Sequence, residues 1–155
     1  MIEVRRIRGD DERARALVTA MEAGVAAAHG PITPDRTSLV SPEEMCPPGG
    51  AFVVVLEDGR AVAGGGLRRL GAGVAEIKRM YTVPEARGRG HGRRLLEGLE
   101  DAARALGYAR VRLDTAASMP VARALYVASG YAPIEDYNGN SYAAFWGEKR
   151  LEDAS

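Results

Sequence analysis

The sequence predicts a single α/β domain in which helices cover both faces of a mixed sheet of about seven strands. Two patterns lead to this prediction: short strand-like runs alternate with segments of helical spacing, and no internal repeat or long linker divides residues 1–155. The composition agrees, because 46% apolar and 27% charged residues are typical of an ordinary globular domain.

The first third of the chain is expected to hold one strand followed by helices. Apolar and polar residues alternate over residues 2–8, and Asp10 or Asp11 is a natural N-cap for the helix that follows. The apolar stripe of that helix is expected to consist of Ala14, Leu17, Val18, Met21 and Val25. The proline-rich segment after it leaves room for one short helix, at Asp35–Val40 or at Pro42–Met45.

A hairpin is expected next, formed by residues 52–57 and 60–70. Its turn is Asp58-Gly59, a strong two-residue hairpin signal. Three glycines, Gly64–Gly66, interrupt the second strand, and they indicate either a bulge or a close approach of another chain segment.

The second half of the chain is expected to begin with a crossover unit. A strand at 74–83, a helix at 90–107 and a strand at 109–115 should form a right-handed unit whose two strands are parallel. Ligands usually bind at the ends of such parallel strands. The elements expected after this unit are a helix at 120–129 and strands at 131–136 and 142–150.

The bulk properties exclude several classes of protein. The formal net charge is zero, which gives no general attraction to nucleic acid or acidic membranes. The single cysteine, Cys46, cannot form an internal disulfide, and we expect no metal site. No apolar run is long enough for a membrane span, and the first residues lack the apolar core of a signal peptide. We therefore expect a cytoplasmic protein.

The most informative segment is a glycine-alternating turn between a strand that ends near Pro84 and a helix. Glycines at 88, 90 and 92 let backbone amides approach a ligand, and the helix adds the unpaired donors of its first turn. Arginines at 87, 89 and 93 add positive charge, with only Glu85 close by in sequence to oppose them. The alternative is a flexible turn with solvated arginines, but the flanking strand and helix favour a phosphate or pyrophosphate site.

Several segments, in order along the chain, resemble those of the GNAT superfamily of N-acetyltransferases. Arg87, Gly90 and Gly92 match its central Gln/Arg-x-x-Gly-x-Gly/Ala motif. The other matching segments are Ile77–Tyr81, Leu125-Tyr126-x-x-x-Gly130-Tyr131 and the closing Trp146–Leu151. The resemblance covers about residues 50–151, and it implies a mostly antiparallel sheet around the central parallel β-α-β unit.

The resemblance also implies the co-substrate, acetyl-CoA, and the residues that hold it. Backbone groups of Met80, Tyr81 and Thr82 would pair with the pantetheine arm, and the amides of Gly88 through Arg93 would hold the pyrophosphate. A splayed gap between strands 74–83 and 109–115 would receive the thioester. The residues implied in cofactor binding are Met80, Tyr81, Thr82, Arg87, Gly88, Arg89, Gly90, His91, Gly92 and Arg93. Met119 departs from the family, where many relatives carry asparagine or glutamine, so one contact with the pantetheine arm is in doubt.

Two catalytic residues are implied for direct attack of an amine through a tetrahedral intermediate. Glu76 lies eleven residues before Arg87, where one branch of the family places its general base. The alternatives are a salt bridge with a neighbouring arginine, binding of the substrate's cation, or loss of the proton through water. Tyr126 matches a tyrosine that protonates the leaving thiolate, with a packing role as its alternative. The oxyanion donor would be a main-chain amide near Tyr81.

The expected activity is acetyl transfer to a primary amine of a small molecule, an amino acid or a peptide or protein. The alternative is a catalytically inactive CoA-binding sensor or interaction module, and a role in binding nucleic acid is the weakest hypothesis. The resemblance is compatible with a homodimer. The further candidates for caps or acceptor contacts are Asp114, Thr115, Tyr137, Asn138, Asn140 and Tyr142, whereas His29 and His91 are not expected to be catalytic.

Overall fold

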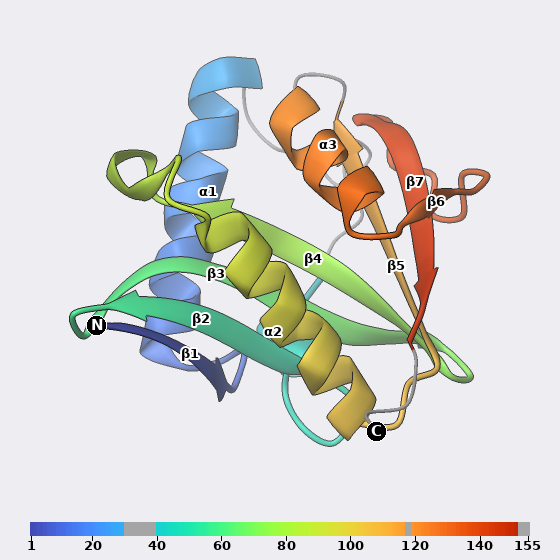
Figure 1. Ribbon diagram of the computed structural model, residues 1–155, viewed down its shortest axis with the longest axis horizontal. Coiled ribbons are helices and arrows are strands. Elements are labelled where there is room, and N and C mark those ends of the chain that lie inside the picture. The colour runs from blue at the N-terminus through green and yellow to red at the C-terminus, as the bar shows by residue number, and fades with distance from the viewer. Residues whose placement is uncertain (30–39, 117–118, 152–155) are drawn as a thin grey trace.

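The computed structural model of the chain describes residues 1–29, 40–116 and 119–151. Its seven strands form one sheet in the order β1-β2-β3-β4-β5-β7-β6. Every neighbouring pair is antiparallel except β4 and β5, which are parallel and joined by helix α2 (Figure 1). The predicted fold class, a mostly antiparallel sheet with a central parallel unit, is therefore confirmed.

The elements follow the expected order. The strands are β1 Ile2–Ile7, β2 Ala51–Glu57, β3 Arg60–Gly71, β4 Val74–Thr82, β5 Arg110–Ala116, β6 Ala132–Pro133 and β7 Ala143–Arg150. The helices are α1 Glu12–His29, α2 His91–Ala105 and α3 Pro120–Ala128, with short 3-10 helices at Pro42–Met45 and Pro84–Ala86. Of the two positions expected for a short helix, Pro42–Met45 is confirmed, and Asp35–Val40 lies mostly outside the described residues.

Helices lie on both faces of the sheet, as predicted, and each face has its own apolar core. Figure 1 shows α2 and α3 in front of the sheet and α1 behind it. On the α2 face the core includes Leu96 and Leu99 of the helix and Val53 of β2, all 1% exposed or less. On the α1 face, Leu17 of the helix packs with Phe52 of β2 in a second cluster. Alternate residues of β2 thus serve opposite cores, because side chains alternate along a strand.

The tight turns follow the sequence signals. Asp58 and Gly59 both have positive φ, of 51° and 85°, which matches the two-residue hairpin turn predicted for this dipeptide. Helix α2 stops at Gly107, with φ of 89°, and α3 stops before Gly130, with φ of 99°. At the start of α1, the Asp11 side chain accepts the backbone N–H of Arg13 at 2.9 Å, which confirms an aspartate N-cap.

The glycines of β3 allow side chains of neighbouring elements to pack closely against the strand. The bulge beside these glycines is in β4. A Cβ on Gly64 would lie 2.6 Å from Leu17 Cδ1, and one on Gly66 would lie 2.0 Å from Met45 Sδ. Between the pairs Gly66–Lys78 and Gly64–Tyr81, β3 contributes one residue and β4 contributes two. The extra residue therefore bulges out of β4, where Arg79 has φ of 62°.

One predicted strand is wrong in length. Strand β6 comprises only Ala132–Pro133 instead of 131–136, because Pro133 supplies no N–H to extend a ladder and the chain then turns away. The Asp136 side chain accepts the backbone N–H groups of Asn138, at 3.0 Å, and Gly139, at 2.7 Å. This turn brings the following residues back over the sheet.

Within the described ranges, no helix combines the length and apolar character needed to cross a bilayer.

Candidate functional site

Strands β4 and β5 run together for only a short distance. Their parallel ladder comprises three residue pairs, from Val74–Arg110 to Glu76–Arg112. Beyond it, β5 continues to pair with β7, and β4 continues to pair with β3. Figure 1 shows the two strands diverging from there. Within the described residues, the remainder of β4, up to Thr82, therefore has no ladder partner on its β5 side, as the predicted splayed gap requires.

The chain leaves β4 through the 3-10 helix and enters the glycine turn, which we define as Arg87–Arg93. Gly88 and Gly90 both have φ of 80°, a conformation that disfavours residues with a Cβ. Gly90 is the N-cap of α2, and within the described chain no side chain caps the helix there. The first-turn amides of α2 thus remain available to a ligand, and the helix dipole favours a negative one.

At position 92, glycine is required by helix packing and not by the backbone conformation. A Cβ at this position would lie 3.3 Å from Leu125 Cδ2 of α3, which is tighter than ordinary contact. The residue therefore permits α2 and α3 to pack closely. Of the three alternating glycines, two serve the backbone conformation of the turn and one serves helix packing.

The arginines of the glycine turn are partly engaged by the protein itself. Arg87 Nε donates to the Thr82 carbonyl oxygen at 3.0 Å, and its guanidinium lies over the Tyr81 ring. Arg89 Nη1 lies 2.9 Å from Glu57 Oε1 on β2. Arg93 lies 3.7 Å from Glu97 and its side chain is 71% exposed. The backbone of the turn is thus fixed while all three guanidinium groups stay near its surface.

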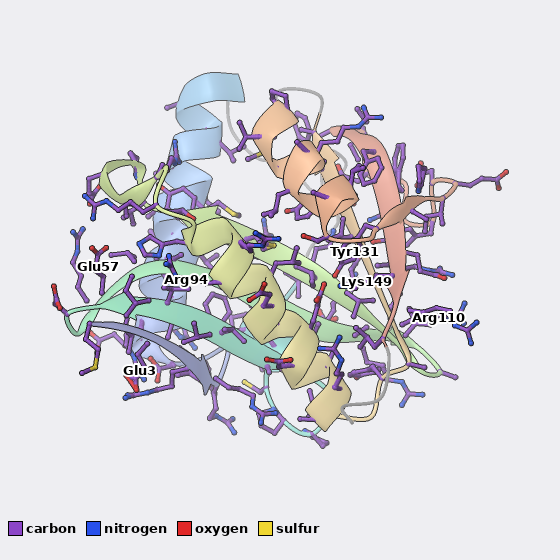
Figure 2. All side chains as sticks on the ribbon, viewed as in Figure 1. Glu3, Glu57, Arg94, Arg110, Tyr131 and Lys149 are labelled. Atoms are coloured by element: carbon purple, nitrogen blue, oxygen red, sulfur yellow. The ribbon has the colours of Figure 1, made fainter. Side chains whose placement is uncertain are left out.

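Glu57 is the acidic neighbour that sequence reasoning missed. Glu85, which was expected to oppose the arginines of the turn, pairs instead with Arg60 at 2.6 Å. Glu57 lies at the far end of a strand more than thirty positions earlier, and only the β2–α2 packing brings it here. Figure 2 shows Glu57 and Arg94 on the side of the molecule where α2 begins. Arg94 donates to the Arg89 carbonyl oxygen at 2.7 Å, which adds a further brace.

The His91 side chain is buried against β2. It is 1% exposed, and its Nε2 lies 3.2 Å from Glu57 Oε2. A contribution of His91 to a phosphate site therefore rests on its backbone amide, the first of α2. The described geometry gives the ring a role in fixing the helix start.

The second half of α2 is held in place by a buried carboxylate. Glu100 is 4% exposed and accepts Tyr131 Oη at 2.8 Å and Lys149 Nζ at 3.0 Å. Figure 2 shows Tyr131 and Lys149 side by side between α2 and β7. This contact ties the second half of α2 to the last strand, whereas Glu57 contacts the helix at its start.

Tyr126 of α3 reaches the unpaired part of β4. Its side chain is buried, and its hydroxyl donates to Met80 Sδ at 3.5 Å. Burial, with a smaller effect from the charge of Asp114, raises the pKa of Tyr126 to about 12. The hydroxyl is therefore a proton donor across the neutral range. The structure brings it next to one of the β4 residues predicted to bind the cofactor.

Glu76 is fully buried and each of its oxygens is occupied. Oε1 accepts the Arg68 guanidinium at 2.9 Å, and Oε2 accepts Tyr137 Oη at 2.7 Å. Asn138 Nδ2 donates to Oε2 at 3.2 Å and Lys78 Nζ lies 3.7 Å away. The salt bridge with a neighbouring arginine, which the sequence left as an alternative for Glu76, is present.

Asp114 of β5 completes what we call the polar cluster: Arg68, Glu76, Lys78, Asp114, Tyr137 and Asn138. Asn138 Nδ2 lies 2.5 Å from Asp114 Oδ2, and Lys78 Nζ lies 3.7 Å from the same oxygen. Arg68 also pairs with Glu44 at 2.9 Å, so the two cations of the cluster contact three carboxylates. Burial raises the pKa of the Tyr137 hydroxyl, and the charge and hydrogen bond of Glu76 raise it further.

The loop candidates are brought together only in part. Tyr137 and Asn138 join the cluster directly, and Asn140 Nδ2 lies 3.3 Å from Asp114. The Tyr142 backbone N–H donates to the Asn140 side chain at 3.0 Å, so Tyr142 holds the loop. Arg68 was missed. Its signal was available in principle, because the β3–β4 register places it opposite Glu76.

Met119 occupies the N-cap of α3 without capping it. Its backbone lies at φ −122° and ψ 64°, its side chain makes no capping hydrogen bond, and the residue is 51% exposed. Among the described residues, Met119 thus offers no side-chain donor at the start of α3, whereas the Tyr126 hydroxyl of the same helix contacts Met80 of β4.

The comparisons with known proteins agree with this geometry. The family model described as Acetyltransferase (GNAT) family matches residues 13–131. A protein named IAA acetyltransferase from Azospirillum brasilense is 37% identical over 115 residues, which are 72% of this chain and 75% of that protein.

Two solved structures show the same fold at low sequence identity. The structure of an acetyltransferase of the GNAT family from Staphylococcus aureus is 15% identical with a TM-score of 0.77, and the match covers 98% of this chain and 100% of that one. The PaiA N-acetyltransferase from Thermoplasma acidophilum, in complex with coenzyme A, is 20% identical with a TM-score of 0.70, and the match covers 97% and 99%.

Proposed function

The chain belongs to the acetyltransferase (GNAT) family, and from this membership we propose that it transfers the acetyl group of acetyl-CoA to a primary amine. The acceptor belongs to the small molecules, amino acids or peptides. The observation that carries the proposal is a continuous backbone surface: the unpaired side of β4 leads directly into a glycine turn and an uncapped helix start. A sensor or interaction module that binds CoA without catalysis is the competing function.

The glycine turn fits the pyrophosphate of acetyl-CoA. With φ of 80° at Gly88 and Gly90, the turn has a conformation in which the amides from Gly88 to Arg93 would hold one anionic group. Exposed guanidinium groups of Arg87, Arg89 and Arg93 add charge at its rim. Backbone groups of Met80, Tyr81 and Thr82 would take the pantetheine arm as an added strand, because β5 does not occupy that side of β4. When bound, acetyl-CoA supplies an acetyl group activated as a thioester.

Tyr126 is proposed as the acid for the leaving thiolate. Its hydroxyl lies beside Met80, on the part of β4 that would carry the pantetheine arm. A pKa of about 12 keeps the hydroxyl protonated, but a free thiol has a pKa of about 8.5. Complete proton transfer to the thiolate would therefore be uphill in the ligand-free protein. Tyr126 acts first as a hydrogen-bond donor that stabilises the developing negative charge on sulfur.

The bulge in β4 is proposed to supply the oxyanion donor. An extra residue in one strand leaves a main-chain group outside the ladder. In β4 this residue is at Arg79–Met80, immediately before Tyr81. The position agrees with the main-chain donor expected near Tyr81, and it requires no side chain.

The role of Glu76 as general base stays a prediction, and its geometry supports a positioning role. A fully buried carboxylate that accepts Arg68, Tyr137 and Asn138 has no oxygen turned toward an incoming amine. We infer that Glu76 fixes the Tyr137–Asn138 loop against the sheet and that the ammonium proton leaves through water. In Glu76→Gln, a direct base role predicts loss of the acidic limb of the pH–kcat profile, whereas a positioning role predicts a lower kcat with that limb retained.

The first test is a thermal shift with acetyl-CoA, CoA and ATP. A tight ligand in large excess should stabilise the fold by about 2 to 4 kcal/mol, and ATP at the same concentration should stabilise it far less. The same protein is then supplied with acetyl-CoA and a panel of amines, with thiol release as the readout. Binding with turnover supports the transferase. Binding without turnover of any amine supports the sensor, and no shift with either CoA compound contradicts both functions.

A further inference from the structure

Arg79 is a cation in an unusual place. It is the residue with φ of 62° at the β4 bulge, although this left-handed region is unfavourable for residues that carry a Cβ. Its side chain is half-buried. Within residues 1–29, 40–116 and 119–151, it has neither a hydrogen bond nor an ion pair. The neighbouring cation Lys78, in contrast, lies near both carboxylates of the polar cluster.

Arg79 lines a cavity of about 440 Å³ between α1 and the sheet, which is large enough for a small metabolite. The charged residues in its lining are Arg15 and Glu22 of α1 and Arg79 itself. Among the lining residues that the structure describes, two cations and one anion give one net positive charge. Val18 and Met45 supply apolar walls. The cavity therefore combines an apolar body with a single excess cation.

A guanidinium in this setting is suited to an anion. Burial lowers the pKa of Arg79, yet arginine stays charged at neutral pH, and the charge of Glu22 only partly offsets the cost of burying this guanidinium. Its planar fork of donors matches a carboxylate in a two-point contact. One excess positive charge fits a singly charged carboxylate better than a dianion such as a phosphate monoester.

Arg79 also lies next to the proposed point of acetyl transfer. It directly precedes Met80, the residue that contacts the Tyr126 hydroxyl. A ligand held on Arg79 would therefore reach the same stretch of β4 from the α1 face.

We propose that this cavity binds a carboxylate of the acceptor, so that the acceptor is an amine that also carries a carboxylate, as a free amino acid does. The proposal rests on the acetyl transfer proposed above and specifies its substrate class. Arg79 is the specificity-determining residue. Glu22 and Arg15, which also line the cavity, contribute to the electrostatic potential at the bound acceptor.

The test compares acids with their amides. The full chain is assayed with acetyl-CoA and the common amino acids, each beside the corresponding amino acid amide, and the diamine putrescine serves as an acceptor without a carboxylate. For the amino acids that are turned over, kcat/KM should exceed that of the matched amide by about tenfold to a hundredfold, because the amide leaves Arg79 without its charged partner.

Variants at Arg79 identify the residue responsible. Arg79→Asn is preferred over alanine, because asparagine tolerates the left-handed conformation and avoids a folding defect. In this variant the acid-to-amide ratio of kcat/KM should fall close to one, and Arg79→Lys should restore part of it as a point charge. Arg69→Asn, an exposed arginine on β3 that does not line the cavity, makes the same change in net charge and should leave the ratio unchanged.

Several outcomes would overturn the proposal and leave acetyl transfer intact. They are equal use of acids and amides by the wild type, turnover of putrescine alone, an unchanged ratio in Arg79→Asn, and failure of every acid in a protein that acetyl-CoA still stabilises. If acetyl-CoA neither stabilises the protein nor is consumed, the proposed function itself fails, and the carboxylate site fails with it.

Discussion

The glycine turn and the polar cluster both depend on strand β4, yet they are built in different ways. The turn is one continuous segment, Arg87–Arg93, and its working groups are backbone amides with charged side chains exposed around them. The cluster draws buried side chains from β3, β4, β5 and the β6–β7 loop. A backbone site needs few particular side chains, whereas a cluster of buried charges fails when one member is removed.

This difference predicts which changes are tolerated. In the turn, conformation and electrostatics matter more than any single side chain. In the cluster, every member is a partner of another buried group, so each is costly to replace. The predictions below separate the two regions, beginning with the largest effect.

Gly90→Asp should weaken acetyl-CoA binding on the order of a thousandfold. It adds a Cβ in a left-handed conformation and places a carboxylate beside the proposed pyrophosphate, where like charges cost several kcal/mol. Isothermal titration measures the loss. Gly73→Asp is the matched control, since Gly73 has φ of 70° in the β3–β4 turn with open space around it. Equal losses in both variants would contradict a specific role for the glycine turn.

Glu76→Gln should lower the free energy of unfolding by about 3 kcal/mol. It removes a fully buried charge that Arg68 and Lys78 face, and breaking a buried pair leaves its partner uncompensated. Urea denaturation gives the value. Glu85→Gln breaks the exposed pair with Arg60 and should leave the free energy of unfolding nearly unchanged. If the two substitutions cost the same, the polar cluster is not held together by its charges.

Tyr126→Phe should reduce kcat by about a hundredfold, because it removes the proposed donor to the leaving thiolate while filling the same space. The affinity for acetyl-CoA should be unchanged. Tyr131→Phe is the control. Its ring packs against Tyr126 at 6.1 Å, but its hydroxyl bonds to Glu100, so its loss should lower stability and spare kcat. A similar fall in kcat for both variants would reduce Tyr126 to a packing residue.

The wild type and Tyr126→Phe should also differ in how their stability changes in alkaline solution, and this effect is smaller. Burial raises the pKa of Tyr126 from 10.0 to about 12 in the folded state, so the unfolded chain loses this proton first as pH rises. Stability from the neutral hydroxyl is present below pH 10 and is lost between pH 10 and 12. By pH 11 the wild type should lose about 1 kcal/mol more than Tyr126→Phe, relative to pH 8, in urea denaturation. A constant difference between the two proteins would contradict the raised pKa.

The fold could be predicted because its signals are local. Asp58-Gly59, Gly107 and Gly130 each specify a turn or a helix end from their own conformational preferences, and the structure confirms all three. Strand β6 was overestimated because residues 134–136 look extended in isolation, whereas Asp136 turns the chain toward the polar cluster.

The candidate site could be predicted only in part, for the same reason. The glycine turn is one contiguous segment, so its sequence alone predicts a phosphate site. The residues around Glu76 are not contiguous. Arg68 lies eight residues away on a neighbouring strand, and Tyr137 lies sixty-one residues away on a loop. Glu57 beside Arg89 was missed likewise. Such contacts depend on strand register and helix packing, which local patterns do not specify.

The central claim is that backbone amides of the glycine turn hold acetyl-CoA, and amide NMR tests it most directly. A titration of the ¹⁵N-labelled protein with acetyl-CoA should give the largest shift changes at the amides of Gly88 to Arg93 and of Met80 to Thr82, with little change at the amides around Glu100. If acetyl-CoA binds while the amides of the turn keep their shifts, the cofactor site lies elsewhere and the account is wrong.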